Sequence, residues 1–221
     1  MKKILSILFI LLLACSLTGC GEKPEPVEDP GQQTDDVSQQ PEEVSVFGVQ
    51  SGNDYANEFF GFVLKLDDDW IYYNEEEIAQ VNQTANDNMG EAYQELQEGS
   101  KAITDMIAQN PEMGSNIVVT LERVSALQSR MLTVEKYYEI LQEQMFEIYA
   151  DSPLEIKDVK NNEVTFLEEQ LPGLLIEESI NGADLKQQIL ILKEGDYFLS
   201  FTISGQDESD FQDILDHFYP Y

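Results

Sequence analysis

Apolar residues in the second half of the chain recur at alternating positions, in short runs bounded by turn residues. These runs predict β-strands at 154–160, 163–170, 174–180, 185–193 and 197–204. The breaks between them are Asn161-Asn162, Pro172-Gly173, Asn181-Gly182 and Glu194-Gly195-Asp196, and Asn-Gly is the strongest hairpin signal because both residues tolerate positive φ. Similar runs upstream predict strands at 59–66, 70–73 and 116–124. The pattern indicates a mostly antiparallel sheet.

Apolar residues three or four positions apart predict helices between these strands. One long helix follows Asn74 and Glu77, which have capping-box spacing; its apolar stripe is Ile78, Val81, Ala85, Met89, Ala92 and Leu96. A second helical stretch contains Ile103, Met106 and Ile107 and ends before Pro111. Further helices are expected at 134–148, after Thr133, and at 209–218, where Ser209 and Gln212 form the cap. The order of elements predicts a single α+β domain over residues 45–221.

The first 20 residues have a different pattern. Lys2 and Lys3 precede an apolar run from Ile4 to Ala14, which is shorter than the roughly 20 residues that cross a bilayer. Leu17-Thr18-Gly19-Cys20 follows, and the whole segment resembles a bacterial lipoprotein signal peptide with its lipobox. The resemblance implies that residues 1–19 are removed and that Cys20 is lipidated, which would anchor the protein on the extracytoplasmic face of the cell membrane. An uncleaved transmembrane anchor is the alternative.

Residues 20–44 are predicted to be a disordered acidic linker, because eight acidic residues and four prolines accompany only one lysine and few aliphatic residues. Without residues 1–19 the chain keeps 10 basic and 43 acidic residues, a formal charge of −33. This charge repels nucleic acids and anionic lipid headgroups. Nucleic-acid binding is therefore excluded, and membrane attachment depends on the acyl chains.

The cysteines and the histidine offer little chemistry inside the domain. Cys15 lies in the signal segment and Cys20 carries the lipid, so the domain has no disulfide and its stability depends on an apolar core. His217 is the single histidine and is expected to be a partly exposed residue of the last helix. The sequence contains no nucleophile elbow, zinc-protease or phosphate-loop motif, which argues against an enzyme.

Acidic and aromatic clusters leave alternatives open. Asp67-Asp68-Asp69 follows a strand and reads as a polar turn, although its carboxylates could supply oxygen ligands to Ca²⁺. Glu75-Glu76-Glu77 suits the first turn of a helix, with a cation site as the alternative. The aromatic residues are expected to pack in the core or to line a ligand groove; they are Trp70, Tyr72, Tyr73, Tyr137, Tyr138 and Tyr197.

Three stretches resemble the PsbP-like family in the same order along the chain. They are Phe62 to Trp70, with a strand, a turn and a tryptophan; Leu132 to Tyr138; and Gly195 to Thr202 before the terminal helix. The resemblance covers about residues 45–221 and implies an α/β/α sandwich with a non-catalytic binding or assembly role. It implies no active site, and the helical stretch expected at 86–110 is an addition to the family pattern.

The leading hypothesis is a lipid-anchored, non-catalytic binding or assembly module whose partner is an envelope protein or ligand of unknown identity. It requires no cofactor. A second hypothesis is a carrier or sensor of a divalent cation, with Ca²⁺ held by clustered carboxylates such as Asp67, Asp68 and Asp69. A third is a hydrolase with a carboxylate pair, for which 43 acidic residues supply candidates by chance.

Overall fold

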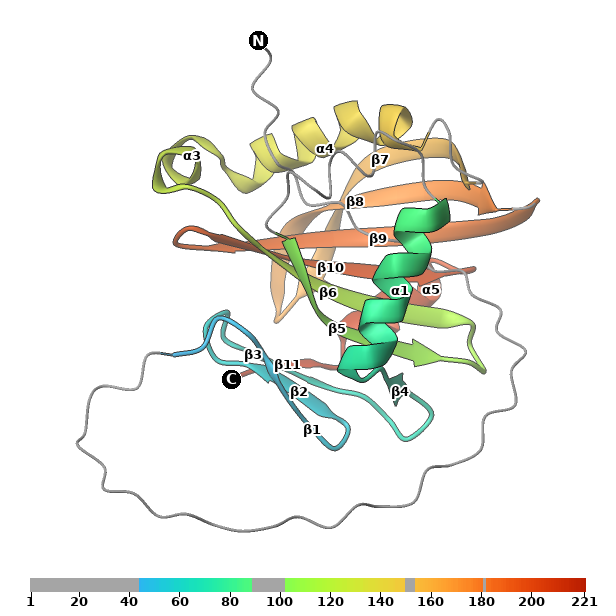
Figure 1. The fold of residues 1–221 in the computed structure, drawn as a ribbon, viewed down its shortest axis with the longest axis horizontal. Helices are drawn as coiled ribbons and strands as arrows, with labels where there is room; N and C mark the ends of the chain where they lie inside the picture. The colour runs from blue at the N-terminus through green and yellow to red at the C-terminus, as the bar shows by residue number, and fades with distance from the viewer. Residues whose placement is uncertain (1–43, 89–101, 150–153, 181) are drawn as a thin grey trace.

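A computed structural model describes residues 44–88, 102–149, 154–180 and 182–221 (Figure 1). The proposed signal peptide, Cys20 and the linker up to residue 43 lie outside the described residues. No helix among the described residues is long and apolar enough to cross a membrane.

A seven-stranded antiparallel sheet forms the centre of the molecule, with strand order β4-β5-β6-β10-β9-β8-β7. Its strands are β4 (Ile71–Tyr72), β5 (Ala102–Asn110), β6 (Ser115–Arg123), β7 (Leu154–Phe166), β8 (Glu169–Ile180), β9 (Ala183–Glu194) and β10 (Tyr197–Gly205). From β7 to β10 each strand pairs with the next in sequence, as a meander does. The predicted antiparallel sheet and strand positions near 116–124 and 185–204 are confirmed.

A second, four-stranded sheet covers part of one face of the large sheet. It contains β1 (Val49–Ser51), β2 (Asp54–Asn57), β3 (Phe62–Lys65) and β11 (Phe218–Pro220), in the order β1-β2-β3-β11. Four phenylalanines join the two sheets, with all pairs of ring centroids 4.9–6.4 Å apart: Phe62, Phe166, Phe201 and Phe218. Their burial makes this interface the larger apolar core.

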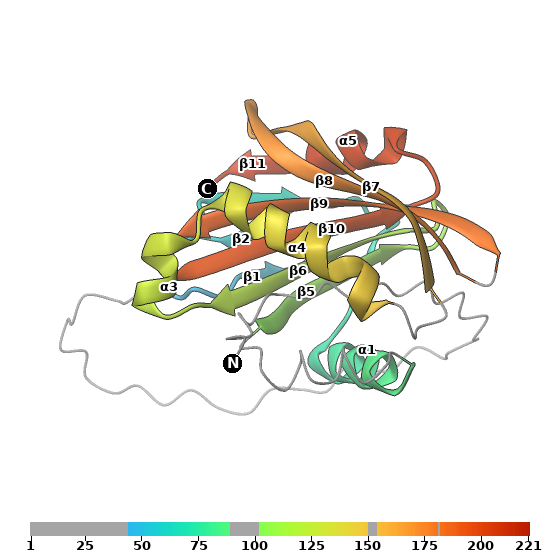
Figure 2. The same cartoon turned by 90° about the horizontal axis from the view of Figure 1, so that it is seen from above.

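Helices lie over both faces of the large sheet (Figure 2). The described helices are α1 (Glu75–Asn88), α3 (Ala126–Met131), α4 (Val134–Ile148) and α5 (Ser209–Leu215). α4 lies diagonally across one face, where Tyr137, Leu141 and Met145 pack in the second apolar core. α5 packs on the other face beside the small sheet. The mixed α+β class is confirmed, but the layer opposite α4 combines a helix with a sheet.

The helix predicted around Ile103, Met106 and Ile107 is wrong, because this segment is strand β5. β5 pairs with β6, and the register shifts between Thr104 and Met106, which makes Asp105 an extra residue. This β-bulge interrupts the alternation of apolar and polar residues. The two halves of the strand then mimic helical spacing in the sequence. Residues 89–101, which connect α1 to β5, lie outside the described residues.

The strand breaks predicted at Asn161-Asn162 and Pro172-Gly173 are also wrong. Asn161 and Asn162 pair with Leu174 and Gly173 inside one long β7–β8 hairpin. Its turn is formed by Leu167 and Glu168, which have φ of 49° and 67°. Two positive φ values fit a type I′ turn, which glycine and asparagine favour. The sequence carries neither residue at this turn, so the turn gave no signal.

The end of the chain differs from its prediction as well. The last helix ends at Leu215, and Phe218–Pro220 form β11, which pairs with β3. The Nδ1 atom of His217 lies 2.9 Å from the Lys65 carbonyl oxygen, and the Lys65 N–H donates to the His217 carbonyl. His217 is therefore tied to the small sheet. The short helix α3, capped by Ser125 and Gln128, was not predicted.

Candidate functional site

Strand β10 has two opposite faces that are both buried. Leu199, Phe201 and Ile203 point into the core between the two sheets. The alternate positions, Ser200, Thr202 and Ser204, point to the face that α4 partly covers, and each is at most 1% exposed. The same face begins with Phe198, which stacks on Tyr137 of α4. Along β10, this face therefore changes from apolar to polar within a few residues.

The polar positions continue onto the two neighbouring strands. Ser204 lies opposite Gln187 of β9. Gln187 in turn lies opposite Ile176 of β8, and Glu178 stands on the same face two residues further along. Gln187 and Glu178 are 1% and 2% exposed. We call these five residues, Ser200, Thr202, Ser204, Gln187 and Glu178, the polar row.

Each member of the polar row has a buried atom that makes no hydrogen bond within the described part of the chain. These atoms are Ser200 Oγ, Thr202 Oγ1, Ser204 Oγ, Gln187 Nε2 and Glu178 Oε1. A buried polar atom without a partner costs about 1–3 kcal/mol. Five such atoms on one face of one sheet together lower the free energy of unfolding, which indicates that these residues have a role other than stability.

Glu178 is the ionisable member of the row. Burial alone raises the pKa of its carboxyl to about 8, because a charge is poorly solvated there. At neutral pH this side chain is therefore mainly protonated, and the row as a whole carries little charge. A protonated carboxyl can donate one hydrogen bond as well as accept others.

The polar row lies between two helices. α4 packs on the apolar part of the same face, where the Tyr138 hydroxyl donates to the Pro172 carbonyl and accepts from the Ile191 N–H. Across the sheet, Thr120 lies opposite Ser200 and Thr104 lies opposite Thr120. The Thr104 hydroxyl then donates to Asn82 of α1 at 3.3 Å. Polar side chains thus extend from the row to the second helix, which lies beside β5 (Figure 2).

The arrangement supplies hydrogen bonds rather than a nucleophile with its base. None of the three hydroxyls of the row bonds to Glu178 among the described residues. Nucleophilic catalysis needs the nucleophile and base within hydrogen-bond reach. The row offers several hydrogen-bonding groups that carry little charge, and no observation on it favours the hydrolase hypothesis.

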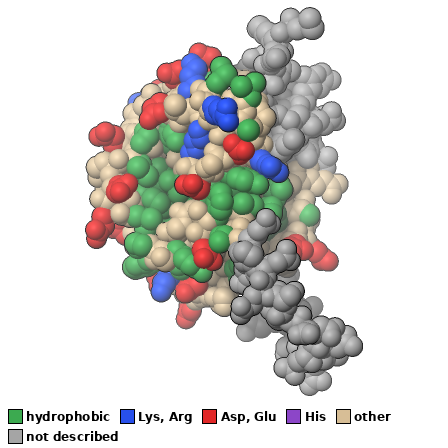
Figure 3. All heavy atoms as spheres, turned by 90° about the vertical axis from the view of Figure 1, so that its left-hand side faces the viewer, with side chains coloured by type: hydrophobic (Ala, Val, Ile, Leu, Met, Phe, Trp, Pro, Cys, Tyr) green, Lys and Arg blue, Asp and Glu red, His purple; other side chains and the backbone are tan. Residues whose placement is uncertain are grey.

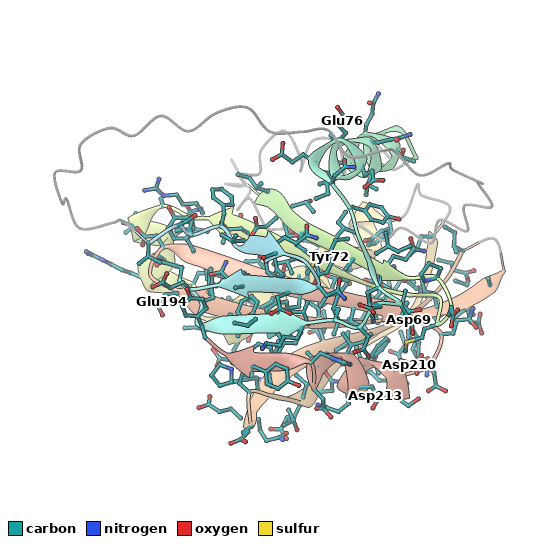
Figure 4. The ribbon with its side chains drawn as sticks, turned by 90° about the horizontal axis from the view of Figure 1, so that it is seen from below. Asp69, Tyr72, Glu76, Glu194, Asp210 and Asp213 are labelled. Carbon is teal, nitrogen blue, oxygen red and sulfur yellow. The ribbon has the colours of Figure 1, made fainter. Side chains whose placement is uncertain are left out.

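Asp67-Asp68-Asp69 forms the predicted turn between β3 and β4. The Trp70 N–H donates to the Asp67 carbonyl, and Asp68 accepts a hydrogen bond from the Asn53 amide at 2.6 Å. The described residues contain no group of three histidine, cysteine, aspartate or glutamate side chains placed to hold a metal. Figure 4 shows Glu76 on α1 and Glu194 at the end of β9 well apart from Asp69, Asp210 and Asp213. The cation hypothesis gains no support from these positions.

The other predicted candidates have structural partners. Asn74 and Glu77 form the expected capping box, in which each N–H bonds the other side chain, at 2.8 and 3.0 Å. The aromatic residues do not share one groove, because Trp70 lies in the core between the sheets and Tyr137 and Tyr138 lie under α4 on the opposite face. Cys20 lies outside the described residues, so its lipidation stays a prediction.

A second polar cluster ties the start of the domain to the β5 bulge. Asp105 accepts hydrogen bonds from the Gly48 N–H at 2.8 Å and from the Tyr55 hydroxyl at 2.5 Å. Burial raises the pKa of the Asp105 carboxyl, and these two hydrogen bonds offset part of that rise. A side chain at Gly48 would overlap the Tyr55 ring. These contacts hold the start of the domain against β5, so the cluster has a structural role.

Apolar side chains gather on the end of the molecule that Figure 3 faces. Leu127 and Met131 of α3 are 71% and 75% exposed. Phe59 contacts Tyr197, over which the Arg123 guanidinium lies 5.6 Å from the ring centroid. This surface combines exposed apolar groups with a cation, in contrast to the strongly acidic chain as a whole.

The sequence did not predict the polar row, because each of its residues occupies a position where polar residues are common in strands. The run Phe198-Leu199-Ser200-Phe201-Thr202-Ile203-Ser204 alternates apolar and polar residues, as a strand with one solvent-facing side does. Gln187 and Glu178 lie on two other strands. Only the pairing of β8, β9 and β10 brings the five residues together.

No protein-family model and no curated protein sequence matches the chain. Among solved structures, the chain is similar to cyanobacterial PsbP (CyanoP) from Synechocystis sp. PCC 6803, with a TM-score of 0.47 and 10% identity over 83% of this chain and 99% of that one. It is also similar to a protein from Bacteroides thetaiotaomicron VPI-5482, with a TM-score of 0.39 and 9% identity over 72% of this chain and 45% of that one. A PsbP-like protein is thus among its structural neighbours, at a low score.

Proposed function

We propose that this protein is a lipid-anchored, extracytoplasmic binding module of the PsbP-like type that does not catalyse a reaction. Its ligand site is the polar row. The observation that carries the proposal is the set of five buried polar atoms without partners on one face of the sheet. A ligand that supplies those partners would recover the free energy that the row costs the empty protein.

The N-terminal sequence supports the anchoring part of the proposal. Two lysines, a short apolar run and Leu17-Thr18-Gly19-Cys20 are the features of a lipoprotein signal. Each acyl methylene buried in a bilayer contributes about 0.8 kcal/mol, so two or more chains outweigh the repulsion between the acidic protein and the headgroups. The 24 residues from 21 to 44 would span roughly 25–30 Å as a flexible chain, which would keep a lipid-anchored domain close to the membrane.

Replacing Cys20 tests the anchor. The Cys20→Ala variant should leave the membrane fraction or keep its signal segment, which cell fractionation and the mass of the N-terminal peptide would reveal. Cys15→Ala is the matched control, because it lies five residues earlier and should leave lipidation unchanged. If Cys20→Ala remained in the membrane fraction with residues 1–19 removed, the anchoring proposal would be wrong.

Analysis of the isolated protein tests the ligand site. The lipidated protein is purified from its own cells in phospholipid nanodiscs and denatured, and the released small molecules are identified by mass spectrometry. A molecule bound at the row should be recovered at a fixed ratio to protein and should be lost from the Thr202→Val, Gln187→Leu double variant. Thr165→Val is the control, because Thr165 is exposed and lies far from the row on β7. Equal recovery from the wild type and the double variant would exclude the row as the site.

A further inference from the structure

We infer that the polar row binds a neutral, hydroxyl-rich small molecule of the carbohydrate class. The inference rests on the proposed function, because it names the ligand of the same site.

The row offers donors and acceptors together. Each of the three hydroxyls, on Ser200, Thr202 and Ser204, can donate one hydrogen bond and accept others. The unpartnered amide nitrogen of Gln187 can only donate, whereas the unpartnered oxygen of Glu178 can accept. Sugar hydroxyls also donate and accept, so they can satisfy both kinds of group. A simple ammonium ion only donates and would leave the Gln187 nitrogen without a partner.

The row is extended in two directions. Ser200 and Ser204 are four residues apart on β10, about 13 Å, and two strand spacings of about 4.8 Å separate β10 from β8. A single atom or ion would reach only one or two of these groups. A molecule with several hydroxyls spread over its frame would contact the row at several points.

The charge of the site disfavours anions. No lysine, arginine or histidine belongs to the row, and the chain as a whole carries a large negative charge. Charged side chains near Glu178 on β7, β8 and β9 form ion pairs: Lys157 with Asp184, and Lys160 with Asp158 and Glu177. On α4, Glu139 and Glu143 are exposed. Burial is the sole cause of the raised pKa of Glu178, so these neighbours leave its carboxyl mainly neutral at pH 7.

Three probes with the same ring test the class of ligand. Glucose is neutral, glucosamine carries an ammonium group near neutral pH and glucuronic acid carries a carboxylate. Binding to the lipidated protein in nanodiscs is measured by calorimetry at pH 6.5. We expect saturable binding of glucose, binding of glucosamine at least about tenfold weaker, and no binding of glucuronic acid. Thr202→Val should weaken glucose binding about tenfold, whereas Thr165→Val should not change it.

The pH dependence separates a neutral ligand from a cationic one. For a neutral ligand, the affinity should be constant below pH 7 and fall about tenfold per pH unit above pH 8. Ionised Glu178 has no proton to donate to the ligand, and a neutral ligand would bury its charge without a counter-charge. Glu178→Gln should abolish this fall and keep the binding. For a cation, the affinity should instead rise with pH up to about 8.

The outcomes distinguish the inference from the proposed function. Tighter binding of glucosamine than of glucose, or an affinity that rises with pH, overturns the inference and leaves the site intact. If none of the three probes binds, the inference is wrong. The proposed function fails with it only if the protein isolated from its own cells also carries no molecule that depends on Thr202 and Gln187.

Discussion

The two faces of strand β10 are equally buried, yet they differ in how well their side chains are satisfied. On one face Leu199, Phe201 and Ile203 join an aromatic core in which every large side chain has apolar neighbours. On the other, Ser200, Thr202 and Ser204 end in hydroxyls without partners among the described residues. Burial of the first face stabilises the folded protein, because the transfer of apolar groups out of water is favourable. Burial of the second face destabilises it, because polar groups that leave water without a partner lose their hydrogen bonds. One strand thus serves stability on one side and recognition on the other.

Phe201→Ala should have the largest effect, because its ring contacts Phe62, Phe166 and Phe218 at the junction of the two sheets. The free energy of unfolding should fall by about 3–5 kcal/mol, the usual cost of removing a buried phenylalanine ring. Chemical denaturation followed by circular dichroism measures it. A loss below 1 kcal/mol would mean that this face does not carry the main core.

Glu178→Gln should change how stability depends on pH. The folded-state pKa of Glu178, about 8, lies above the ordinary value of 4.5, so the folded protein holds a proton that the unfolded chain releases. Glu178 therefore lowers stability progressively from about pH 4.5 to pH 8, by an amount on the order of 5 kcal/mol in total.

The glutamine variant should match the wild type near pH 4.5 and be more stable by a few kcal/mol at pH 9. Unfolding midpoints across this range compare the two proteins. The general repulsion among acidic groups affects both proteins nearly equally and cancels in the difference. If the stability of the two proteins changed with pH in parallel, the carboxyl of Glu178 would have an ordinary pKa in the folded protein and would be solvated.

Thr202→Val should have a smaller effect on stability than Phe201→Ala or Glu178→Gln, and its sign should be opposite to that of Phe201→Ala. Valine has nearly the same shape but no hydroxyl, so the variant removes an unpaired buried oxygen and should gain about 1 kcal/mol in the ligand-free protein. Thr165→Val, on an exposed position, should change stability by less than 0.5 kcal/mol in either direction. Destabilisation by Thr202→Val would show that its hydroxyl has a partner and that the two faces do not differ in kind.

Local sequence patterns predicted those elements whose signals are complete within a few residues. The Asn74–Glu77 cap, the α4 stripe and the Gly195 turn, which has a φ of 55°, each depend on neighbours in the chain, and each is confirmed. Patterns failed where a distant partner decides the conformation. β5 reads as a helix because its bulge is defined only by pairing with β6, and Phe218 leaves the helical stripe because its ring fits between the sheets.

The sequence by itself determined an α+β domain, its dominant antiparallel sheet, its acidic charge and the absence of a recognisable catalytic motif, because propensity, turn chemistry and composition are local properties. The tertiary structure decided the second sheet, the β7–β8 hairpin and the polar row. Ser200, Gln187 and Glu178 lie on three strands, and their spacing in sequence carries no sign that they share a face. Strand register places them together, and burial turns ordinary polar residues into a candidate site.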